Sequence, residues 1–202
     1  MAKPKMYMDP RLVELLACLA KAQKDASLGG AAWAIGGAMG MQAHGVRRYT
    51  NDIDVFVDPE RRLDMLRALR SAGLTVSPVF APHHYVARLP EHDDPEIRID
   101  VLVPEDDPEV SAAYMAVHAT LAKWKFPVFT PEMLVIAKFY SDQPGAVDDI
   151  SRMLDAGIVD RVEAVRLLAL MDKKDAAELA KLFAAIGKPK TARPRPKRKP
   201  SR

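Results

Sequence analysis

The sequence predicts an α/β (α+β) protein, in which a mixed sheet with flanking helices is followed by a small C-terminal helical bundle and a disordered basic tail. Three observations indicate this: β-like runs recur between residues 52 and 103, helical periodicity begins near residue 130, and residues 188–202 carry eight Lys or Arg and no acid. We therefore expect an α/β domain with an N-terminal helix at residues 1–130, a helical region packed on it at 131–187, and the tail at 188–202.

The first elements of the α/β half are predicted from apolar spacing and glycines. Residues 10–26 place leucines at helical spacing: Leu12, Leu15, Leu16 and Leu19. Residues 31–45 then read as a short apolar strand, a turn at Gly36 and Gly37, and a helix that ends near Gly45.

The remaining strands of this half follow from alternation. Residues 52–57, DIDVFV, place every second side chain on an apolar face, which is typical of a half-buried strand. Asp58 and Pro59 end this strand and begin a helix that runs to Ser71. Three further β-like runs are expected to extend the same sheet: residues 74–80, 84–89 and 96–103.

The second half is predicted to be helical. Thr130 followed by Pro131 is an N-cap signal, since a threonine hydroxyl accepts a backbone N–H and proline fits the first turn. Four helices are expected after it: residues 131–141, 146–157, 160–171 and 174–187.

Composition and the absence of targeting signals predict where in the cell the protein is found. The 202 residues contain 30 Lys or Arg and 27 Asp or Glu. No segment predicts a bilayer span or a signal peptide, and the single cysteine excludes an internal disulfide. We expect a cytoplasmic protein without a membrane segment.

The charge is unevenly distributed. The whole chain carries +3, so the eight cations of residues 188–202 leave a net charge of −5 on residues 1–187. The tail has no large apolar residue, so we expect it to be disordered. A solubilising end is one interpretation, and an arm that binds nucleic acid by counterion release is the one we favour.

Acidic residues on predicted strands indicate a metal site. Asp52 and Asp54 project from one face of their strand, and two adjacent carboxylates are stabilised by a hard divalent cation, with Mg²⁺ the natural candidate. If the strand of residues 96–103 neighbours the first, Asp100 becomes a third carboxylate. Upstream, Gly36 and Gly37 at a helix start predict close backbone approach and free N–H donors for phosphate oxygens.

This combination resembles the DNA polymerase β-like nucleotidyltransferase superfamily, whose signature is a glycine pair followed by D-x-D. Here Gly36 and Gly37 precede Asp52-Ile53-Asp54 by 14 residues. The segment GGAMGMQAHGVRRYTNDIDVFV is most similar to the AbiEii-like bacterial branch, which includes toxins of toxin–antitoxin pairs. The resemblance covers about residues 30–155 and implies a nucleotidyltransferase-type mixed sheet.

The resemblance also implies roles for single residues. Gly36 and Gly37 would cradle a triphosphate, and Asp52 and Asp54 would bind two Mg²⁺ ions. Asp100 would complete the metal site and help activate the acceptor hydroxyl.

Further nucleotide contacts are implied by the same family pattern. Arg48 and Thr50 match its polar approach to the first aspartate, and Lys138 occupies the place of a family lysine that contacts phosphate. The chain departs from the family where relatives carry Arg-x-x-Lys-Asp-x-x-Asp, because only Asp149-Ile150 of that segment is kept. The departure puts nucleotide selectivity, and with it activity, in question.

The function that follows is Mg²⁺-dependent transfer of a nucleoside monophosphate from an NTP to an acceptor hydroxyl. The acceptor is left open between RNA such as tRNA, a small molecule of the antibiotic type, and a protein hydroxyl. An antitoxin protein is a further expected partner if the chain is a toxin. The alternative from another class is a catalytically degenerate fold that binds nucleic acid or a partner protein.

A second acidic and histidine-rich segment is a weaker candidate for a metal site. It contains His83, His84 and His92 beside Glu91, Asp93 and Asp94. Its spacing fits no zinc pattern, so we interpret it as a solvated loop.

Overall fold

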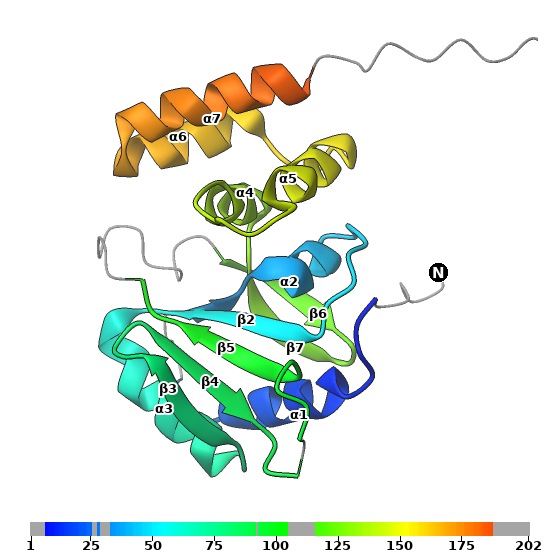
Figure 1. Ribbon diagram of the computed structural model, residues 1–202, viewed down its shortest axis with the longest axis vertical. Coiled ribbons are helices and arrows are strands. Elements are labelled where there is room, and N and C mark those ends of the chain that lie inside the picture. Colours follow the sequence, from blue (N-terminus) through cyan, green and yellow to red (C-terminus); the bar gives the residue numbers. More distant parts are fainter. Residues whose placement is uncertain (1–6, 26–27, 29–32, 92, 105–115, 188–202) are drawn as a thin grey trace, which may run out of the picture.

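The computed structural model describes residues 7–25, 28, 33–91, 93–104 and 116–187, so the prediction for the tail lies outside the described residues. Its centre is a seven-stranded sheet with strand order β3-β4-β5-β2-β1-β7-β6 (Figure 1). The strands are β1 (Trp33–Ile35), β2 (Asp52–Val57), β3 (Thr75–Phe80), β4 (His84–Arg88), β5 (Arg98–Leu102), β6 (Ala116–Leu121) and β7 (Trp124–Phe129). The sheet is mixed, since β2–β5 and β1–β7 are parallel and the other pairs are antiparallel. The predicted fold class is confirmed.

The helices flank this sheet and then stack beyond it. They are α1 (Leu12–Ala22), α2 (Gly37–Ala43), α3 (Arg62–Ser71), α4 (Pro131–Phe139), α5 (Ala146–Asp155), α6 (Arg161–Met171) and α7 (Lys173–Ile186), with a 3-10 turn, η2 (Pro59–Arg61), before α3. In Figure 1, α4 and α5 lie next to α2, and α6 and α7 lie beyond them, farther from the sheet. None of the described helices is long and apolar enough to cross a membrane.

One face of the sheet packs against α1 and α3. The alternate residues Ile53, Val55 and Val57 of β2 are fully buried there, together with the apolar faces of both helices. The opposite face of β2 therefore carries Asp52, Asp54 and Phe56, as the alternation predicts.

A second apolar cluster joins the helical layer to the sheet. It contains buried residues of α4 to α7 together with Ala34 of β1, Met41 of α2 and Phe129 of β7. The first helix of this layer begins where the sequence predicts, because the Thr130 hydroxyl accepts the backbone N–H of Met133 at 3.3 Å. The division of the chain into domains at residue 130 stays a prediction.

Sequence reasoning missed the β6–β7 hairpin. Its two strands are joined by a two-residue turn, Ala122 and Lys123, and Ala122 has a φ of 54°. Tight hairpin turns usually place Gly, Asn or Asp at such a position, and this turn has none of them. The usual hairpin signal is therefore absent from the sequence.

Candidate active site

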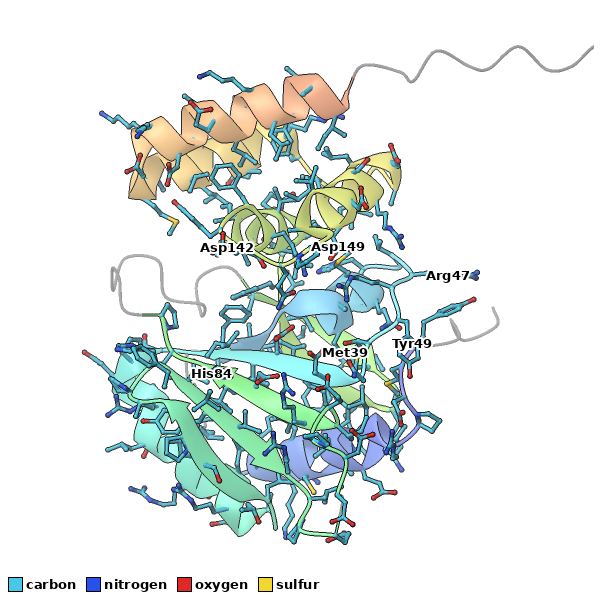
Figure 2. The ribbon with its side chains drawn as sticks, in the orientation of Figure 1. Met39, Arg47, Tyr49, His84, Asp142 and Asp149 are labelled. Atoms are coloured by element: carbon cyan, nitrogen blue, oxygen red, sulfur yellow. The ribbon has the colours of Figure 1, made fainter. Side chains whose placement is uncertain are left out.

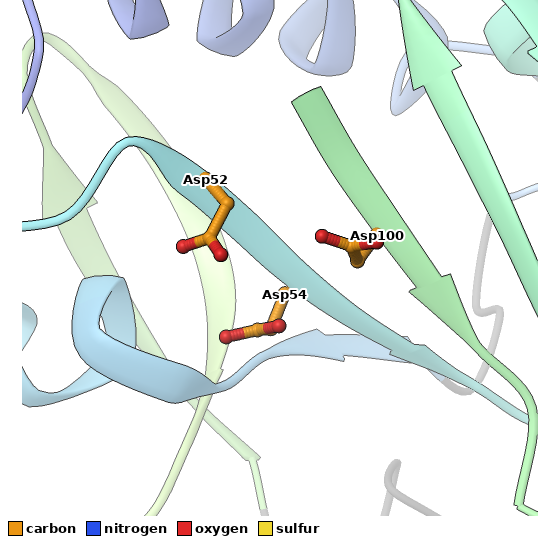
Figure 3. Close-up of side chains that lie close together, drawn as sticks. All are labelled: Asp52, Asp54 and Asp100. Atoms are coloured by element: carbon orange, nitrogen blue, oxygen red, sulfur yellow. The ribbon is translucent and has the colours of Figure 1, made fainter. Parts of the chain in front are cut away.

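Three carboxylates meet on the face of the sheet away from α1 and α3. Asp52 and Asp54 lie on β2, and Asp54 pairs in register with Asp100 on the parallel strand β5. One carboxylate oxygen from each residue lies within 4.8 Å of the others (Figure 3). We call these residues the carboxylate cluster. The sequence predicted that Asp100 would join the other two if its strand neighboured theirs, and this is confirmed.

The charges of the carboxylate cluster are not balanced within the cluster. Burial raises the pKa of Asp54 to about 7, the neighbouring charges of Asp52 and Asp100 add to the rise, and Lys138 and Arg48 oppose it. Three convergent carboxylate oxygens are the donor set that a hard cation prefers. The residues present therefore fit Mg²⁺ at Asp52, Asp54 and Asp100.

Asp52 and Asp100 each have hydrogen-bond partners outside the carboxylate cluster. The Thr50 hydroxyl, which is buried at the loop before β2, donates to Asp52 Oδ1. Asp100 is 5% exposed, and its two oxygens lie 2.8 Å from His84 Nε2 and Arg98 Nε. The predicted strand that begins at His84 is confirmed as β4, next to β5, whereas the interpretation of His84 as part of a solvated loop is wrong, because its ring contacts the buried Asp100.

Gly36 and Gly37 leave no room for a side chain, because their backbone lies close to side chains on the same face of β2. A Cβ on Gly37, whose φ is 53°, would lie 1.7 Å from Asp54 Oδ2, and a Cβ on Gly36 would lie 2.5 Å from Phe56 Cε2. Any side chain at Gly37 would thus occupy the space next to the Asp54 carboxylate. The expectation of free N–H donors at both positions is wrong for Gly36, because its N–H donates to the Asp54 carbonyl oxygen at 2.9 Å.

The two predicted phosphate-binding cations converge on one acid. Arg48 Nε lies 2.8 Å from Asp149 Oδ2, and Lys138 Nζ lies 3.1 Å from the same oxygen. Asp149 on α5 is 4% exposed and Lys138 on α4 is 8% exposed. We call Arg48, Lys138 and Asp149 the cation cluster. Figure 2 shows Asp149 where α5 faces the α2 side of the sheet.

Asp149 lies beside two of the predicted site residues, and sequence reasoning noted it only as a remnant of a family pattern. Its signal was available in the sequence as an acid among apolar positions of an amphipathic helix, next to Ile150, because an acid on an apolar helical face is seldom buried without a partner. Arg98 was also detectable in the sequence, because it lies two residues before Asp100 on the same strand and therefore on the same face.

The fold is shared with solved nucleotidyltransferase structures at low sequence identity. A crystal structure of ANT(2'')-Ia in complex with adenylyl-2''-tobramycin is similar with a TM-score of 0.53 and 16% identity, covering 85% of this chain and 96% of that chain. A solution structure of the antibiotic-resistance factor ANT(2'')-Ia has a TM-score of 0.53 and 15% identity, covering 86% and 92%.

A third similar structure is an antigenic nucleotidyltransferase-like protein from Paracoccidioides brasiliensis. Its TM-score is 0.51 at 17% identity, covering 87% of this chain and 94% of that chain. No protein-family model and no curated protein sequence matches the chain. The likenesses show a nucleotidyltransferase fold across most of the chain.

Proposed function

We propose that the protein is a Mg²⁺-dependent nucleotidyltransferase that transfers a nucleoside monophosphate from an NTP to an acceptor hydroxyl. The observation that carries this proposal is the carboxylate cluster beside the glycine pair, on a fold shared with nucleotidyltransferases. The acceptor oxygen forms a bond to the α-phosphorus while the bond to the β-phosphate oxygen breaks, so the products are the NMP-acceptor and pyrophosphate.

Each residue of the carboxylate cluster has a role in this proposal. Asp52, Asp54 and Asp100 hold Mg²⁺, which when bound stabilises negative charge on the attacking and leaving oxygens. Two ions are proposed for the cluster. Asp100 also accepts the proton that the acceptor hydroxyl loses, and Thr50 orients Asp52 through its hydrogen bond.

The triphosphate is proposed to bind next to these carboxylates. Gly36 and Gly37 let the backbone approach the triphosphate closely, because neither residue has a side chain between the backbone and the carboxylate face. Arg48 and Lys138 supply positive charge from the cation cluster, within electrostatic range of Asp54.

The reaction is tested by incorporation of labelled nucleotide. Purified protein is incubated with each α-labelled NTP, with and without Mg²⁺, and with total RNA, tRNA or a panel of small hydroxyl acceptors. Mg²⁺-dependent labelling of one acceptor class, lost in Asp54→Ala, supports the proposal. Absence of labelling and of pyrophosphate release with every acceptor, together with nucleic-acid binding by the protein, would favour the catalytically degenerate binding module.

Two acceptor classes have support of their own. An RNA acceptor such as tRNA fits the eight cations of residues 188–202 and the similarity of the GGAMGMQAHGVRRYTNDIDVFV segment to toxin-type enzymes, which would also bring an antitoxin partner. A small-molecule acceptor is supported by the fold shared with ANT(2'')-Ia, which was solved with an adenylylated tobramycin. A protein hydroxyl is the third class that the assay covers.

Deletion of residues 188–202 separates these acceptors. If the tail binds RNA, its removal lowers tRNA affinity and reduces the salt dependence of log affinity by up to about 0.9 for each phosphate that the tail neutralises in the full-length protein. Labelling of a small acceptor would be unchanged. Equal salt slopes for the full-length and truncated proteins would contradict the RNA-binding role of the tail.

A further inference from the structure

Asp100 is held from two strands at once. Its Oδ2 accepts a hydrogen bond from Arg98 Nε on its own strand β5, and its Oδ1 lies 2.8 Å from His84 Nε2 on the neighbouring strand β4. Within the β4–β5 ladder the register partner of Asp100 is Val86, so His84 reaches Asp100 diagonally across the strands. In Figure 2, His84 lies on the sheet and Asp149 lies on the helical layer beyond it.

The two contacts have different geometric effects on the carboxylate. An aspartate carboxylate rotates broadly about its terminal torsion, so a single donor at one oxygen leaves the other oxygen free to swing. A second donor, fixed on another strand, sets the plane of the carboxylate relative to the sheet. Each oxygen keeps a further lone pair, and these remain available toward Asp54 and the cluster.

The contact is not needed to hold the strands together. Strands β4 and β5 pair through their backbones from His84–Leu102 to Ala87–Ile99, and the apolar residues beneath them are buried. His84 itself keeps a side chain that is 30% exposed, whereas Asp100 is almost entirely buried. A hydrogen bond between a partly exposed histidine and a buried carboxylate of the carboxylate cluster is therefore better explained by the orientation of that carboxylate.

We propose that His84 is a positioning residue, which orients Asp100 so that the carboxylate cluster can bind a divalent cation. This inference rests on the proposed function, because it assigns His84 to the same metal site. His84 acts through Asp100 and contacts neither nucleotide nor cation itself. Groups that orient metal ligands typically change metal affinity or activity by about 10–100-fold when removed.

The test uses Mn²⁺ alone as the probe, with the full-length protein and no nucleotide. Binding is followed by the loss of the free Mn²⁺ electron paramagnetic resonance signal, for wild type, His84→Ala and His84→Gln. The matched control is His118→Ala, an exposed histidine on β6 at the other end of the sheet. Melting curves of all four proteins are recorded without metal.

We expect His84→Ala to bind Mn²⁺ about 10–100-fold more weakly, with His84→Gln restoring most of the affinity because its amide donates to Asp100. His118→Ala should match wild type, and all four melting temperatures should lie close together. Binding of a fluorescent ATP analogue without metal should be the same in all four proteins, because the cation cluster is untouched.

Three failures are distinguishable. If wild type binds Mn²⁺ and His84→Ala binds it equally well, the role of His84 is overturned while the metal site stands. If the wild-type protein itself binds no Mn²⁺, the metal site of the proposed function is overturned, and the role of His84 with it. Weaker binding by both His84 variants, without rescue by glutamine, would overturn the hydrogen bond as the cause.

Discussion

The carboxylate cluster and the cation cluster lie on the same side of the molecule but are built in opposite ways. Asp52, Asp54 and Asp100 come from two adjacent parallel strands, so the backbone ladder brings like charges together. Arg48, Lys138 and Asp149 come from a loop and two helices, and they bring opposite charges together. The first cluster holds three acids and no cation, whereas the second holds two cations and one acid and so keeps one excess positive charge.

The difference indicates which cluster needs a ligand. The raised pKa of Asp54 shows that its charged form is disfavoured in the folded protein without a cation. Asp149, in contrast, has two cations within 3.1 Å of one oxygen. We therefore expect substitutions in the carboxylate cluster to affect function more than stability, and substitutions in the cation cluster to lower stability as well as nucleotide binding.

The strongest effect is expected from Asp54→Ala. We predict that this change abolishes nucleotide transfer, because it removes a proposed metal ligand, and that it leaves the fold intact. The measurement is Mg²⁺-dependent incorporation of labelled nucleotide, with a melting curve beside it. Incorporation by Asp54→Ala at the wild-type rate would contradict the site.

Disruption of the cation cluster is expected to lower stability. Asp149→Asn leaves two cations without their shared anion, and we predict a loss of about 2–4 kcal/mol in the free energy of unfolding, less than for a fully buried pair because Arg48 is partly exposed. The melting temperature should fall by about 5–15 °C. The control is Asp148→Asn, at an exposed position of the same helix, which should change the free energy by no more than about 0.5 kcal/mol. Equal melting temperatures for the two variants would show that the clusters do not differ in this way.

A pH series tests whether the raised pKa of Asp54 lowers the stability of the folded protein. The pKa of Asp54 is raised from 3.8 to about 7, so its protonated form stabilises the fold at low pH, and this contribution is lost as pH rises from the lower value to the higher. Asp54→Asn cannot ionise. In EDTA, its free energy of unfolding should therefore exceed that of wild type by an amount that grows between about pH 4 and 7, reaching on the order of 1–3 kcal/mol.

Addition of Mg²⁺ provides an internal control for the same pH series. Mg²⁺ should raise the melting temperature of the wild-type protein at and above about pH 7, because it binds only the folded site, and should not raise that of Asp54→Asn. A difference between the two proteins that is constant across the pH range would contradict the raised pKa of Asp54.

The weakest effect is expected at Thr50. Thr50→Val removes the buried hydroxyl that donates to Asp52 from the loop before β2, and we predict a loss of about 1 kcal/mol, or about 2–4 °C in melting temperature. Thr50→Ser keeps the hydroxyl and should lie closer to wild type. If valine and serine behave alike, the hydrogen bond does not contribute to the stability of the cluster.

Local patterns along the chain were enough to specify the parts of this site that lie close in sequence. Alternation along DIDVFV placed Asp52 and Asp54 on one face and Ile53 on the other, because side chains of a strand alternate whatever the strand's neighbours are. The turn at Gly36 and Gly37 and the N-cap at Thr130 were likewise predicted, since each depends on residues only a few positions apart.

Which distant residues meet depends on strand order and helix packing. The parallel pairing of β2 with β5 brings Asp100 to Asp54, and the antiparallel pairing of β4 with β5 brings His84 to Asp100. The packing of α4 and α5 brings Lys138 and Asp149 to Arg48. Both kinds of arrangement are set by burial of apolar surface across the whole chain, so no pattern within a short segment specifies them.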